Sequence, residues 1–177
     1  MIGYHFTAET LRDGRAIPPI GEWLEHEGPI EPCVSGLHAS EHPFDAFSFA
    51  PGNLLHRVEL EGDLQSHGAP INKWAGCRRR ILGSIDAEPI LREFARWCAL
   101  QVIHLWDAPT IVREYLETGD EPKRDAARDA AWAAARAAAE AAAWAAAWDA
   151  ARDAQRKRFA SMVDAAFSAA KAAGGEE

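Results

Sequence analysis

A chain of 177 residues is long enough for one domain with a sizeable core and an appendage, and it has no run of about 18 apolar residues that would predict a membrane span. The formal net charge of −8 falls entirely on residues 1–120, because residues 121–177 carry equal numbers of acidic and basic side chains. Such an acidic surface repels nucleic-acid backbone and excludes a broad duplex-binding face. The first ten residues lack the pattern of a signal peptide, so we expect a cytoplasmic protein.

Short strands dominate the first half of the chain. Aromatic and β-branched residues between Gly and Pro turns predict five extended segments: residues 3–7, 29–34, 37–39, 54–60 and 80–85. Between the third and fourth of these, Ser40 is a good N-cap, and Pro43 in the first turn predicts a short helix.

Helices are predicted for the second half. Asp86 caps a long helix, in which apolar residues recur at helical spacing, and Pro109 begins a further short helix that Gly119 ends. Alanine, the strongest helix former, dominates the chain from Pro122 onward. We therefore predict an α+β protein with a small mixed or antiparallel β head and packed helices over residues 1–120. A long alanine-rich α-helical tail follows over residues 121–177.

The large side chains of the tail recur every four residues, so they wind around the helix by about 40° per step rather than forming one stripe. Trp132, Trp144 and Trp148 therefore require cover on more than one side. Folding back as a hairpin or self-association would supply it. We expect self-association into a homo-oligomer, because no Gly or Pro between Pro122 and Gly174 offers a turn.

The seven histidines all lie at or before His104, so we expect chemistry near neutral pH in the head. On the first predicted strand His5 and Thr7 face one way, whereas Tyr4 and Phe6 face the other. This arrangement suits a strand that lines a cleft, and it equally suits an edge strand with one wet face.

A second histidine, His38, lies between Ser35 and Ser40 on another extended segment and has the same two interpretations. No zinc site is expected, because Pro43 prevents one helix from carrying both His38 and His42. The three cysteines are odd in number and widely spaced, which excludes a disulfide framework and predicts three buried thiols.

Charged residues on the later strands offer two further candidates. Glu59 and Glu61 lie on one face of the clearest strand, where paired carboxylates serve as a general base, orient a ribose hydroxyl or form a solvated face. Lys73, Arg79 and Arg80 belong to a basic region that suits a phosphate or simply offsets the acidic field. No dinucleotide-binding, P-loop, metalloprotease or hydrolase motif is present.

Two resemblances involve these residues. The segments Tyr4-His5-Phe6-Thr7 and Ser35-Gly36-Leu37-His38-Ala39-Ser40, with the alanine-rich tail, resemble a family of bacterial and phage proteins of unassigned function. The His-x-Thr strand also resembles the opening of ADP-ribosyltransferase-like folds, in which this histidine holds the nicotinamide ribose of NAD.

The second resemblance implies that His5 positions ribose and that Glu59 or Glu61 is the catalytic carboxylate. It also implies NAD-binding residues on the strands around them, namely Tyr4, Thr7, Ser35, His38, Ser40, Arg79 and Arg80.

Three functions follow from these readings. The first is a nucleotide-binding head of ADP-ribosyltransferase-like type that acts on NAD or a related ADP-ribosyl nucleotide. The second is a non-catalytic phage- or defence-associated module that captures a nucleotide signal or a protein partner. The third is a structural protein that assembles through its tail.

Overall fold

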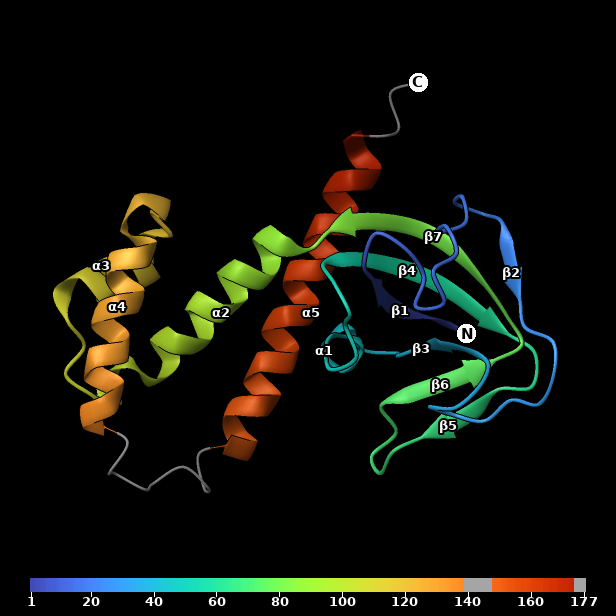
Figure 1. The fold of residues 1–177 in the computed structure, drawn as a ribbon, viewed down its shortest axis with the longest axis horizontal. Coiled ribbons are helices and arrows are strands. Elements are labelled where there is room, and N and C mark those ends of the chain that lie inside the picture. Colours follow the sequence, from blue (N-terminus) through green and yellow to red (C-terminus); the bar gives the residue numbers. More distant parts are fainter. Residues whose placement is uncertain (139–147, 174–177) are drawn as a thin grey trace. The chain divides into compact units, whose positions relative to one another are not determined.

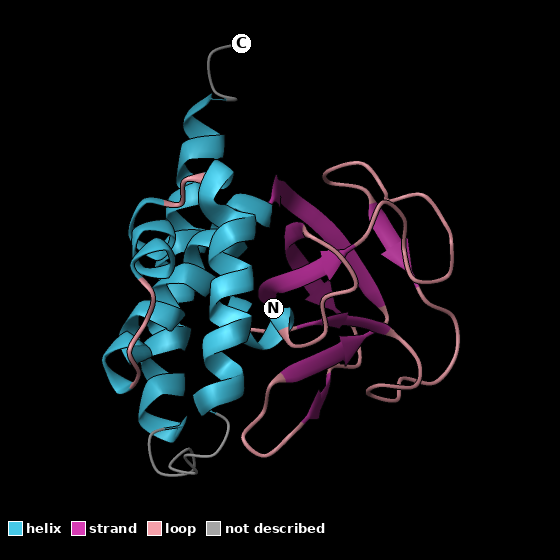
Figure 2. Cartoon of the chain, turned by 60° about the vertical axis from the view of Figure 1, so that its left-hand side comes forward, coloured by secondary structure: helices cyan, strands magenta, loops and turns pink. Residues whose placement is uncertain are grey.

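The computed structural model describes residues 1–138 and 148–173, and the chain divides into two compact units (Figure 1). The first unit joins Met1–Glu88 to Arg156–Glu177, and the second is Pro89–Gln155. The predicted α+β class is confirmed: in the described residues the strands belong to the first unit and the second is helical (Figure 2). The units differ from a head and a tail, because the end of the predicted tail belongs with the strands.

Seven strands in two sheets build the first unit, and every strand pairing between them is antiparallel. The larger sheet has the order β1-β4-β7-β2 and the smaller one β3-β6-β5. Their bounds are β1 Ile2–Thr7, β2 Trp23–Glu25, β3 Leu37–Ala39, β4 Leu54–Glu61, β5 Gln65–His67, β6 Lys73–Gly76 and β7 Arg78–Asp86. A reciprocal pair of backbone hydrogen bonds between Tyr4 and Ser40, 2.7 and 2.9 Å, links the edge of one sheet to the other.

One predicted strand is wrong. Residues 29–34 form no strand, because the backbone turns at Glu31 and returns to pair with Ser35 through an isolated bridge. The turn places Cys33 in the left-handed region, with φ of 70°.

The four-stranded sheet has two covered faces. One face packs on the smaller sheet through a core of buried side chains: Leu37, Ala39, Val58, Leu60 and Ile81. The other face carries Phe6, which contacts Phe47 of α1 (Pro43–Phe47). Phe47 in turn contacts Phe159 of α5 (Trp148–Ala173), with ring centroids 5.6 Å apart.

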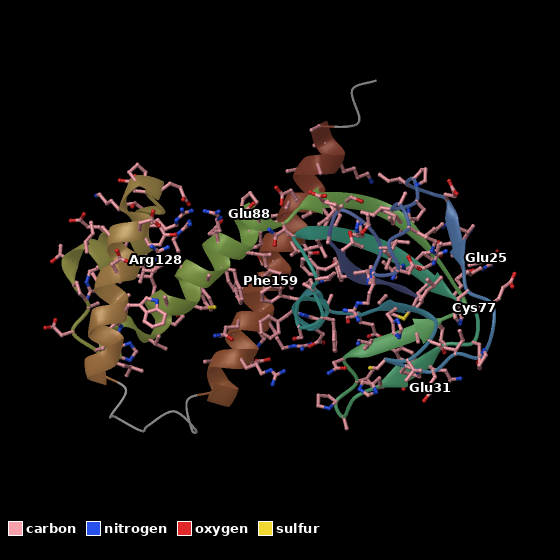
Figure 3. The ribbon with its side chains drawn as sticks, in the orientation of Figure 1. Glu25, Glu31, Cys77, Glu88, Arg128 and Phe159 are labelled. Atoms are coloured by element: carbon pink, nitrogen blue, oxygen red, sulfur yellow. The ribbon has the colours of Figure 1, made fainter. Side chains whose placement is uncertain are left out.

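The C-terminal helix therefore completes the core of the first unit. Phe159, labelled in Figure 3, and Val163 are fully buried. An ion pair fixes the same helix to α1, where Arg156 Nη2 donates to Asp45 Oδ2 at 2.7 Å. The apolar side chains of this part of the predicted tail are therefore buried within the first unit of the same chain.

The second unit contains α2 (Glu88–Val102), a 3₁₀ turn (Ile103–Leu105), α3 (Thr110–Thr118), α4 (Glu121–Ala138) and the start of α5 as far as Gln155. Asp86 accepts a hydrogen bond from the Glu88 amide at 2.9 Å, as its predicted capping role requires. Gly119 ends α3 with φ of 69°, a conformation that glycine adopts without strain. None of the helices in the described ranges has the length and apolarity needed to cross a bilayer.

Of the three tail tryptophans that were predicted to need cover, the structure describes the side chain of one. The Trp132 side chain on α4 is 68% exposed. Trp144 and the question of a turn in residues 139–147 lie outside the described residues, as does the side chain of Trp148. Self-association through the tail stays a prediction.

Candidate functional site

A pocket of about 460 Å³ lies within the first unit. Its walls are β1, β3, the loop 11–15, the turn 33–36 and residues 46–51, which include the end of α1 and the segment that follows it. β6 and β7 each add one basic side chain. The pocket therefore depends on the sequence from Tyr4 to Arg79 and on the contact between the two sheets.

The charge of the pocket is opposite to that of the protein. Four cationic side chains line it, namely Arg12, Arg15, Lys73 and Arg79, whereas Asp13 is the one carboxylate among its lining residues in the described chain. Asp13 is already paired with Arg15 at 2.7 Å. The other three cations have no carboxylate partner in the part of the chain that the structure describes. A basic pocket on an acidic protein concentrates anions.

Arg79 is the most buried of these cations. On β7 it lies opposite Leu60 of β4, which belongs to the core between the two sheets. Its side chain therefore points toward the smaller sheet. It is only 6% exposed, and its Nη1 donates to the His38 carbonyl at 2.6 Å. Burial lowers its pKa to about 10, so it remains charged at neutral pH. A buried guanidinium without a countercharge is costly, and a bound anion offsets that cost.

Two uncharged histidines share the pocket. Burial, followed by the positive charge of Arg79, holds the pKa of His5 well below its usual range. Burial, followed by Lys73 and Arg79, lowers the pKa of His38 to about 4. His38 Nε2 accepts a hydrogen bond from the Cys33 amide at 3.1 Å, which places the imidazole proton on Nδ1.

A third histidine lies behind the pocket wall. His56 is 1% exposed and is the cross-strand partner of His5. Its Nε2 lies 2.8 Å from Thr7 Oγ1 and its Nδ1 lies 2.7 Å from Ser84 Oγ. Burial, with Arg79 as the smaller cause, lowers its pKa to about 4. The Thr7 hydroxyl is therefore engaged with His56, although Thr7 lines the pocket.

The rim of the pocket carries a thiol. Cys33 is exposed, which contradicts the prediction of three buried thiols; Cys77 and Cys98 are half-buried. The turn that displaces the predicted strand brings Cys33 to the surface, where Lys73 Nζ lies 3.5 Å from its sulfur. The same ammonium lies 3.3 Å from the ring centroid of Phe49.

Most of the predicted site residues come together in this pocket. The residues that line it are Tyr4, His5, Thr7, Ser35, His38, Ser40 and Arg79. The Tyr4 hydroxyl nevertheless donates to Asp164 of α5 at 3.1 Å, and burial, followed by Asp164, raises its pKa.

The remaining three residues do not join them. Glu59, Glu61 and Arg80 are absent from the pocket wall. Glu59 pairs with Arg80 at 2.6 Å and Glu61 with Arg78 at 2.5 Å, where the two strands align these residues in register. Because side chains alternate along a strand, the carboxylates and their arginines point away from the face that bears Arg79.

Other pocket residues had no signal in the sequence. Arg12 lies in an irregular loop without periodicity, and His26 follows a strand of only three residues. The His26 Nε2 atom is buried and has no hydrogen-bond partner in the described residues. Within the same residues, no group of three or more His, Cys, Asp or Glu side chains is arranged to hold a metal ion.

Comparisons with known proteins give a family and no activity. No curated protein and no solved structure matches the chain. One family, described as "Domain of unknown function (DUF7666)", matches residues 1–93, more than half of the chain and all of the pocket. The expectation of an uncharacterised family is thereby confirmed, and the chain belongs to the DUF7666 family.

Proposed function

We propose that the pocket binds an anionic nucleotide and that the protein is a nucleotide-binding module without a catalytic step of its own. The observation that carries the proposal is Arg79, a buried guanidinium on the pocket wall with no carboxylate partner in the described residues. Arg12 and Lys73 add further positive charge to the same wall. Such a site stabilises a phosphate through charge and through the several N–H donors of arginine.

The rest of the pocket suits the nucleoside. A volume of about 460 Å³ lies in the range of small-molecule sites. Apolar side chains form part of the wall: Leu11, Ala46, Phe49 and Pro51. Phe49 is 37% exposed, and because Lys73 lies over one face of its ring, a base would stack on the other face.

Catalysis of ADP-ribosyl transfer is the second candidate. The observation that favours it is that His5 and Thr7, the residues of the His-x-Thr strand, both line the pocket. Stabilising an oxocarbenium charge requires a carboxylate beside it, and Glu59 and Glu61 are paired with arginines outside the pocket. Binding without catalysis is therefore the better supported function.

Titration calorimetry on the intact chain tests the proposal with NAD, ADP-ribose and ATP at low ionic strength. We expect at least one of them to bind, and Arg79→Gln to weaken that binding about tenfold or more. Arg80→Gln is the matched control, because it removes the same charge from the next residue of β7 but from outside the pocket.

No binding at millimolar concentration, or an equal loss in both variants, would refute nucleotide binding in this pocket. Release of nicotinamide from NAD that depends on His5 would instead establish the catalytic candidate. The same reaction in Glu59→Gln and Glu61→Gln reports whether either carboxylate takes part.

A further inference from the structure

Four side chains from four segments act on one part of the pocket. They are Arg12 of the loop 11–15, Arg79 of β7, His5 of β1 and His38 of β3. The positive charges of both arginines contribute to the lowered pKa of both histidines. The geometry agrees, because all four side chains line one pocket of about 460 Å³ and Arg79 Nη1 donates to the His38 carbonyl at 2.6 Å.

We propose that this cluster is a subsite for a phosphomonoester dianion, the terminal phosphate of the nucleotide, and that an imidazole of the subsite takes up a proton when the phosphate binds. The inference rests on the proposed function, because it assigns one group of the bound nucleotide to one part of that pocket.

The charge of the cluster favours a dianion. Neither Arg12 nor Arg79 has a carboxylate partner in the described residues, so two positive charges face the subsite. A phosphodiester carries one negative charge and balances only one of them, whereas a phosphomonoester balances both. Phosphate oxygens are acceptors, and the arginine N–H groups are donors in a geometry that matches them.

The side chains whose charges lower the pKa of the two histidines are arginines, a lysine and other histidines. For His5, these side chains are Arg79, His56, His38 and Arg12. For His38, they are Lys73, Arg79, Arg12 and His26. None of these groups is acidic, and Asp13 on the same wall is held by Arg15.

A bound dianion balances the positive charges of Arg12 and Arg79 and places a negative charge beside the imidazoles. An opposite charge within about 4–6 Å raises the pKa of an imidazole by roughly one to three pH units. The His5 ring makes no hydrogen bond among the described residues, so it can take up a proton without breaking an existing bond. Protonation of His38 would displace the Cys33 amide from Nε2.

Calorimetry with inorganic sulfate measures the proton directly. Sulfate is a dianion that takes up no proton between pH 5 and pH 8, so any proton that the buffer gives up on binding must be taken up by the protein. Titrations of the intact chain at pH 6, in buffers of different ionisation enthalpy, give the number of protons bound. We expect uptake, and an affinity that rises as the pH falls, by up to about tenfold per pH unit where the uptake is one full proton.

Variants locate the proton. The double variant His5→Gln and His38→Gln should bind sulfate with no proton uptake, and the single variants show which imidazole carries it. His67→Gln is the matched control, because His67 is exposed on β5 and lies outside the pocket. Uptake that persists in the double variant would overturn the assignment.

A comparison on the unaltered chain needs no variant. Adenosine 5′-monophosphate and its phosphate methyl ester differ in one negative charge, and we expect the monoester to bind about tenfold more tightly. Equal affinities, or sulfate binding without proton uptake, would overturn the inference. NAD or ADP-ribose binding that depends on Arg79 would still support the proposed function, so the two failures are distinguishable.

Discussion

Arg79 provides a test in which stability and binding are expected to move in opposite directions. The fall of its pKa from 12.5 to about 10 through burial corresponds to about 3 kcal/mol against the charged side chain. Arg79→Met removes this cost and keeps most of the side-chain volume. It also removes the hydrogen bond to the His38 carbonyl, which is worth about 1.5–3 kcal/mol for a charged donor. The two effects nearly cancel or favour the variant.

We therefore expect Arg79→Met to unfold in urea with a free energy within about 1 kcal/mol of the wild type, or above it. Leu60→Ala is the reference, because Leu60 is fully buried beside Arg79 on the neighbouring strand and should lose about 2–5 kcal/mol. Sulfate should raise the unfolding free energy of the wild type by more than that of Arg79→Met, because the general stabilising effect of sulfate acts on both and binding acts only on the wild type. A loss above about 3 kcal/mol in Arg79→Met would show that Arg79 serves the fold, and the binding argument would fail.

Four further predictions use other parts of the molecule. Phe159→Ala should lower the free energy of unfolding in urea by about 3–5 kcal/mol, because the ring is fully buried against α1; a loss below 1 kcal/mol would contradict this packing. Iodoacetamide should alkylate Cys33 before Cys77, as peptide mass spectrometry can show, and a bound nucleotide should slow the reaction at Cys33. Stability should fall as the pH drops from about 6.5 to 4, because the unfolded chain binds a proton at His56 before the folded one does. His56→Gln should reduce the fall of the urea midpoint across this range, and the remainder is expected from His5 and His38. The intact chain should sediment as an oligomer that Trp132→Glu weakens, and a monomer at all concentrations would refute self-association.

Alternation along strands could be predicted from the sequence and fixed part of the site. His5 and Thr7 were expected to share one face of the first strand, and both line the pocket. The same rule places Glu59 and Glu61 on one face of β4, but it does not say which face. Register decides that, since Glu59 lies opposite Arg80 and the alternation of β7 turns this pair away from the pocket.

Segments without periodicity could not be predicted. β5 consists of three exposed residues, and the loop 11–15 that supplies Arg12 has no repeating pattern. The turn that exposes Cys33 depends on the pairing of Glu31 with Ser35, and the β-branched and Pro-edged sequence of 29–34 suggested a strand. In residues 121–138 and 148–173 of the tail, alanine predicted helix correctly, but the helical pattern did not say that Phe159 would pack on α1.

The order in which the chain is synthesised has a consequence for the first unit. Asp45 and Arg156 pair across 111 residues, and the whole second unit lies between them in the sequence. At about 5–20 residues per second, translation separates the two partners by roughly 6 to 22 seconds. During that interval Phe44 and Phe47 of α1 have no Phe159 to cover them, so the nascent first unit presents an aromatic surface. A chaperone that binds exposed aromatic segments would have its longest opportunity on this chain between the emergence of α1 and that of α5.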